Sequence, residues 1–77
     1  MANQLARDVE SILSVELGEF IAQATLRKNC ELIGTTTDDL SIAQLPELAN
    51  LIEKSVKFFS GAERGKSLVL KIKAISG

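Results

Sequence analysis

Few side chains in this sequence are of types that carry out chemistry. The chain has no histidine, tryptophan or tyrosine, and its single cysteine is Cys30. Nucleophile and base pairings that depend on histidine, and ordinary zinc or iron sites, therefore lack their usual groups. Catalysis would have to depend on serine, aspartate, glutamate or lysine alone. We therefore predict that the protein is not an enzyme, with no catalytic, cofactor-binding or metal-binding residues and no cofactor.

The densest polar cluster consists of Asp38 and Asp39, which follow three threonines at positions 35–37. A cation-binding or recognition loop is one interpretation, but the cluster lacks the Asp-x-Asp-x-Asp-Gly spacing and the distant glutamate of a calcium loop. Hydroxyl and carboxylate groups at a helix entrance normally satisfy unpaired amides and complement the helix dipole. We therefore interpret the cluster as the structural entrance to a helix.

The composition indicates a single globular domain over residues 1–77, with 45% hydrophobic and 25% charged residues. A lone cysteine excludes an internal disulfide and favours a reducing compartment. The first ten residues mix charged and apolar side chains, so we expect no signal peptide, and no segment is apolar for the length of a membrane span. These features predict a cytoplasmic protein that does not associate with a membrane.

The first half of the chain is predicted to be helical. Apolar side chains from Leu5 to Leu13 recur with the spacing of one helix face and predict a helix over about 3–16. Gly18 predicts a break before a second helix over about 19–33, and one continuous helix over residues 3–33 is the alternative. The second helix has apolar residues on two faces, which is typical of a helix in the middle of a bundle. One face holds Leu17, Phe20, Ile21 and Ala24, and the other holds Ala22, Leu26, Cys30 and Ile33.

A third helix follows a clear start signal. Ser41 and Gln44 have the spacing of a capping box, in which each side chain bonds to the other residue's backbone. Pro46 is incompatible with a helix interior, so either residues 41–45 form one short turn before a helix that starts at Pro46, or a single helix bends there. The apolar spacing from Leu45 to Phe59 predicts a helix that ends at Ser60 and Gly61.

The last segment is predicted to be a fourth helix over about 61–75. Ser60 and Glu63 have the spacing of a second capping box, and Leu68, Val69, Ile72 and Ile75 form the inward face. Residues 68–75 also alternate as a strand would, but no other segment offers such a strand a partner. We therefore predict an all-α fold, a small orthogonal bundle of four helices, or of five if residues 41–45 form a separate short turn.

Charge is distributed unevenly along the chain. Residues 1–53 carry three basic and nine acidic side chains, whereas residues 54–77 carry six basic side chains and one acidic side chain. On the fourth helix, Arg64 and Lys71 lie on one side, and Lys66 and Lys73 lie nearly opposite, without interleaved aromatic residues. We therefore predict a solvated surface and no binding of nucleic acid.

Some apolar residues lie outside the predicted core. Leu51 and Phe58 are seven residues apart on one line of the third helix, and Leu70 lies off the inward face of the fourth. Aligned exposed apolar residues suggest an interaction patch. A core of this size supplies only about 3–5 kcal/mol, so association would add needed stability. We predict that Leu51, Phe58 and Leu70 form an interface in a protein-interaction or regulatory module that binds a protein partner or a second copy, most simply as a homodimer.

Two short segments resemble those of acyl carrier proteins. Val9–Gly18 is similar to the first helix of that family, and Asp38–Leu45 is similar to its Asp-Ser-Leu-x-x-x-Glu-Leu motif. The resemblance aligns Asp39 with the serine that carries phosphopantetheine, and an aspartate cannot form that phosphodiester. Residues 19–33, an irregular loop in the family, are predicted to be helical here. The alternative function is therefore a degenerate acyl-carrier-like or anion-binding helical domain.

Overall fold

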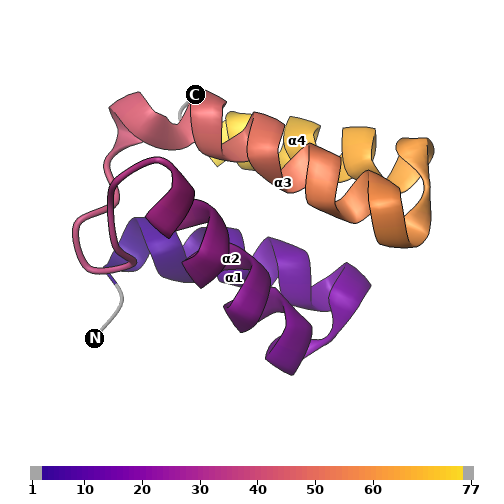
Figure 1. The fold of residues 1–77 in the computed structure, drawn as a ribbon, viewed down its shortest axis with the longest axis horizontal. Coiled ribbons are helices and arrows are strands. Elements are labelled where there is room, and N and C mark those ends of the chain that lie inside the picture. Colours follow the sequence, from indigo (N-terminus) through magenta and orange to yellow (C-terminus); the bar gives the residue numbers. More distant parts are fainter. Residues whose placement is uncertain (1–2, 76–77) are drawn as a thin grey trace.

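The chain folds into two antiparallel helical hairpins that pack against each other. The computed structural model describes residues 3–75, except for the side chains of residues 59 and 60. The first hairpin consists of α1 (Gln4–Leu17) and α2 (Glu19–Leu32), and the second consists of α3 (Leu45–Ser60) and α4 (Ala62–Ile75) (Figure 1). The predicted all-α four-helix class is confirmed, and residues 3–75 contain no strand.

A single glycine forms each hairpin turn. Gly18 has φ 83° and ψ 156°, and Gly61 has φ 92° and ψ 163°. This backbone conformation is almost restricted to glycine because a Cβ atom would be strained there. Residues 3–33 therefore form two helices rather than one, as the break at Gly18 predicted. In Figure 1 both turns lie at the same end of the molecule, opposite the connection between α2 and α3.

The start of α3 follows the first of the two predicted alternatives. Residues 42–44 form a one-turn 3-10 helix, η1 (Ile42–Gln44), and Pro46 lies in the first turn of α3. Proline is tolerated there because the amide it lacks would have no partner inside the helix. The capping box is present, and the Gln44 side-chain oxygen accepts a hydrogen bond of 3.0 Å from the Ser41 amide.

The connection between the hairpins is held by one residue at the start of the chain. The Asn3 side-chain amide donates to the carbonyl oxygens of Asp38 and Leu40, at 3.1 and 2.8 Å. The Asn3 backbone amide donates to the Thr37 carbonyl oxygen at 2.9 Å. The Asn3 side-chain oxygen also accepts from the Ala6 amide and so caps α1. One side chain therefore links the beginning of α1 to the segment that leads into α3.

The last segment is helical throughout its described length. Leu68, Val69 and Ile72 are buried as predicted, and no strand pairing occurs in residues 68–75. Gly65 lies close to α3, where a Cβ atom at this position would be 3.2 Å from the Glu53 carbonyl oxygen. The two helices of the second hairpin therefore approach each other closely at a residue without a side chain.

The core lies between the two hairpins and takes one face from each helix. One prediction about it is wrong: α2 is not enclosed on two sides. Ala22, Leu26 and Cys30 are buried, whereas Phe20 on the opposite face is 81% exposed. In a bundle of two hairpins, each helix has neighbours on one side only, so the second apolar face remains at the surface. The predicted core position Phe59 and the predicted cap Ser60 have side chains outside the described residues.

Candidate functional site

The most prominent functional feature is apolar surface. Several large apolar side chains are exposed although the core is well filled. Scattered exposure is ordinary in proteins, but a contiguous apolar patch indicates an interaction site. The arrangement of these residues over the helices therefore matters more than their number. They are Val15, Phe20, Ile21, Leu32, Ile42, Phe58 and Leu70.

The three predicted interface residues do not form one surface. Phe58 is 87% exposed, Leu70 is 70% exposed and Leu51 is half-buried. Leu70 lies about 140° around α4 from Gly65, the residue that faces α3. Leu70 thus points away from α3, the other helix of its own hairpin. Leu51 and Phe58, by contrast, lie on the same ridge of α3.

The ridge of α3 that carries Leu51 and Phe58 borders α2. Ser55 lies between them, one turn from each, and it lines a shallow pocket together with side chains of α2. Leu51 itself is half-buried, although the helical period alone places it off the core stripe.

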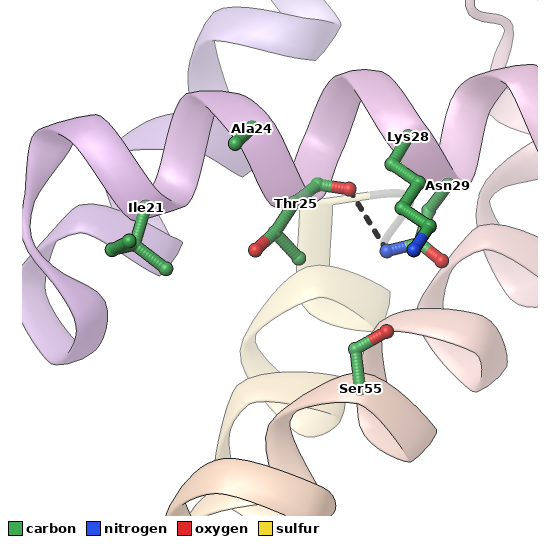
Figure 2. A pocket seen from close by; sticks show the side chains of 6 residues that line it. All are labelled: Ile21, Ala24, Thr25, Lys28, Asn29 and Ser55. Carbon is green, nitrogen blue, oxygen red and sulfur yellow. Dashed lines mark hydrogen bonds between the residues drawn. The ribbon is translucent and has the colours of Figure 1, made fainter.

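The pocket has a volume of about 250 Å³ and lies between α2 and α3 (Figure 2). Asn29 is almost fully buried, and its side-chain amide donates to the Thr25 carbonyl oxygen at 2.8 Å. The Ser55 hydroxyl donates to the Leu51 carbonyl oxygen at 3.2 Å. Both polar side chains thus bond to their own helices. The residues that line the pocket are Ile21, Ala24, Thr25, Lys28, Asn29 and Ser55.

Lys28 is the charged residue in the pocket lining. It is exposed, and in Figure 2 its side chain extends from α2 toward the side on which α3 lies. Lys54 of α3, also exposed, lies three residues after Leu51 and four before Phe58, and so borders both of them on the side away from Ser55. The pocket lining holds no cysteine, carboxylate or histidine, so it provides binding contacts and no nucleophile with an adjacent base.

The apolar residues of α2 at this site were not predicted from the sequence. Ile21 was assigned to a core face, and Leu32 was not assigned at all. The signal was present in the spacing of Ile21, Thr25, Lys28 and Leu32, which lie on one side of a helix. The pattern could not show that this side runs beside the ridge of α3.

Cys30 lies in the core, as predicted, and is fully buried. Burial raises the pKa of its thiol above the ordinary value, because the charged thiolate is poorly solvated there. Among residues 3–75, no three histidine, cysteine or acidic side chains are grouped so that they could bind a metal ion. Within the same range, no helix has the length and apolar character needed to cross a membrane.

An ion pair joins the two hairpins. The Arg64 guanidinium on α4 lies 3.9 Å from a Glu16 carboxylate oxygen on α1. Both residues are close to the glycine turns, so the pair connects the ends of the two hairpins. The two side chains are partly exposed, so solvent screens the attraction and the pair contributes little to stability.

Comparisons with protein-family models, curated proteins and solved structures found no match to this chain. The structure has helix α2 over residues 19–32, where the acyl carrier resemblance implies an irregular loop.

Proposed function

We propose that the protein is a helical interaction or assembly module without catalytic activity. Its working surface is the side of the bundle where α2 and α3 meet. It binds a protein partner there, or a second copy of the chain, through apolar side chains that border the shallow pocket.

The observation that supports this proposal is the pairing of two partly apolar ridges. One is on α2 and includes Ile21 and Leu32, and the other is on α3 and includes Leu51 and Phe58. A domain of this size has a small core and little stability to spare. Exposed apolar residues add no stability to the monomer, so their presence favours burial in a complex. An aromatic side chain as exposed as Phe58 is the kind of residue that anchors an interface.

The proposal places the protein in the cytoplasm, because its one cysteine is free and buried in the core, as is usual for proteins of a reducing compartment. It includes neither nucleic acid nor membrane as a partner. Lys66 and Lys71 lie about 140° apart around α4, so the basic residues do not form one stripe along a groove or phosphate backbone.

Site-specific photo-crosslinking in the native host tests this function. A photoreactive amino acid is placed at Phe58 in one version and, as a matched control, at Ser67, an exposed position on the outer face of α4. We expect a discrete crosslinked product from position 58 and none from position 67. Its mass distinguishes a second copy from a different protein. Equal products from both positions, or none from position 58, would contradict the proposal.

A further inference from the structure

The surface between α2 and α3 has a regular pattern. On α2 the relevant ridge holds Ile21, Thr25, Lys28 and Leu32, and on α3 it holds Leu51, Ser55 and Phe58. The helices run past each other in opposite directions, because both glycine turns lie at the same end of the molecule (Figure 1). The beginning of α2 and the end of α3 therefore lie toward the same end of the molecule.

This arrangement places apolar side chains at both ends of a polar centre. Ile21 is near the beginning of α2 and Phe58 is near the end of α3, whereas Leu32 is the last residue of α2 and Leu51 lies in the first half of α3. The centre contains Lys28 and Ser55 around the pocket. Leu51 and Phe58 are about 10 Å apart along α3, and Ile21 and Leu32 are about 16 Å apart along α2. These spacings match apolar residues placed every two to three turns along a bound helix.

The size of the pocket favours a protein side chain over a small molecule. Pockets for small ligands usually have volumes of about 300–1,000 Å³ and enclose most of the ligand. The pocket here is about 250 Å³ and lies open between two helices. It is suited to one apolar side chain that projects from a neighbouring helix.

The charges on the two ridges indicate the chemistry of the partner. Lys28 and Lys54 are both exposed. Lys28 lies on the α2 ridge, and Lys54 lies on the solvent side of the α3 ridge, about 100° around the helix from Ser55. A two-fold contact between two copies through this surface would bring these lysines toward the same lysines of the other copy, and like charges across an interface are unfavourable. A partner with carboxylates at these positions would instead pair with both lysines. Two exposed acidic residues lie close to this surface: Glu31 is one turn after Lys28 on α2, and Glu47 is two turns before Lys54 on α3.

We propose that the α2–α3 surface binds an amphipathic helix of a different protein, with an apolar ridge that inserts between α2 and α3 and with carboxylates that pair with Lys28 and Lys54. This inference rests on the proposed function and specifies the partner. It replaces the predicted homodimer by a heteromeric complex at this surface.

Designed peptides test the inference directly. The probe is a helical peptide of about 16 residues with leucines spaced for one ridge, flanking glutamates and one tryptophan. The matched peptide carries lysines in place of the glutamates. The protein has no tryptophan, so tryptophan emission reports on the peptide alone. We expect the acidic peptide to bind about tenfold tighter than the basic one, with a difference that shrinks at high salt.

Charge-reversal variants locate the binding site. K28E with K54E should reverse the preference between the two peptides, whereas K66E with K71E, an identical change of net charge on α4, should leave the preference in place. All four lysines are exposed, so both variants should keep the circular dichroism spectrum of the original protein. The inference is overturned if the acidic peptide does not bind at about 1 mM, if the two peptides bind equally, or if the α4 variant reverses the preference as well. A crosslink at position 58 together with such a result would retain the proposed function and reject this partner chemistry.

Discussion

The side-chain amide of Asn3 donates a 2.8 Å hydrogen bond to the carbonyl oxygen of Leu40, which is 37 residues away in the sequence. Leu40 is buried and lies immediately before the capping box of η1. The same Asn3 side chain caps α1 through the Ala6 amide. The position of the α3 entrance thus depends on a residue at the start of the first helix.

Replacement of Asn3 should therefore weaken two parts of the fold at once. We expect Asn3→Ala to lower the free energy of unfolding by about 2 kcal/mol, because it removes the cap of α1 and the hydrogen bonds to the connection between the hairpins. Asn3→Ser keeps a capping oxygen but cannot reach both carbonyls, so its cost should be about half as large. Urea unfolding monitored by circular dichroism measures both. Gln4→Ala, at an exposed neighbouring position, is the control and should change the free energy of unfolding only slightly. If Asn3→Ala changed it no more than Gln4→Ala does, the linking role of Asn3 would be wrong.

The hairpin turns should not tolerate a side chain at their glycines. A Cβ atom at Gly18 or Gly61 would have open space around it, with nothing within 4 Å. The cost of Gly18→Ala or Gly61→Ala therefore comes from the backbone conformation alone, and we expect about 1–3 kcal/mol for each. Thermal unfolding measures this cost. Ser11→Ala at an exposed position of α1 is the control, and the glycine variants should unfold at clearly lower temperature than it does.

The close approach of α3 and α4 should make Gly65 sensitive to side-chain size. Gly65→Ala gains helix propensity of about 1 kcal/mol, which offsets the tight contact with the Glu53 carbonyl, so we expect a small net change. Gly65→Leu would introduce a side chain for which there is no room, so we expect it to lower the free energy of unfolding by about 1–3 kcal/mol or more. Ser67→Leu, on the exposed side of the same helix, is the matched control. If both leucine variants had the same midpoint in urea, the packing at Gly65 would not limit stability.

The buried thiol should react slowly and should couple stability to alkaline pH. Because burial raises the folded-state pKa of Cys30, the unfolded chain releases the thiol proton at lower pH than the folded chain does. The resulting stabilisation is complete below the unfolded-state pKa and is lost as pH rises through the folded-state value. We expect labelling by a thiol reagent to require unfolding. Cys30→Ala should show a smaller loss of stability between about pH 8 and 10, and equal pH slopes would contradict this.

The helices were predictable because their signals are local. The spacing of Leu48, Ile52 and Val56 defines one face of α3 without reference to any other segment. Gly18 and Gly61 each end the helix that directly precedes them. The capping box at Ser41 is likewise a relation between residues three apart. Each of these features depends only on residues close together in the sequence, so it does not depend on how distant segments pack.

The features that were not predicted depend on distant parts of the chain. Phe20 has the same apolar character as a core residue, and only the arrangement of the hairpins leaves it exposed. Leu51 is half-buried although its position lies off the core stripe of its helix. The hydrogen bond between Asn3 and Leu40 is also invisible to periodicity. The proposed interaction surface between α2 and α3 belongs to this class, because residues from two separate helices would form it.

The single-glycine turns have a consequence for how the chain folds. Helix packing within each hairpin is more extensive than packing between the hairpins, so most native contacts join residues that are close in sequence. Low contact order of this kind is associated with folding in microseconds to milliseconds. The last event should be closure of the segment between residues 33 and 41, and its rate should decrease only slightly when that segment is lengthened, since loop-closure entropy grows slowly with length.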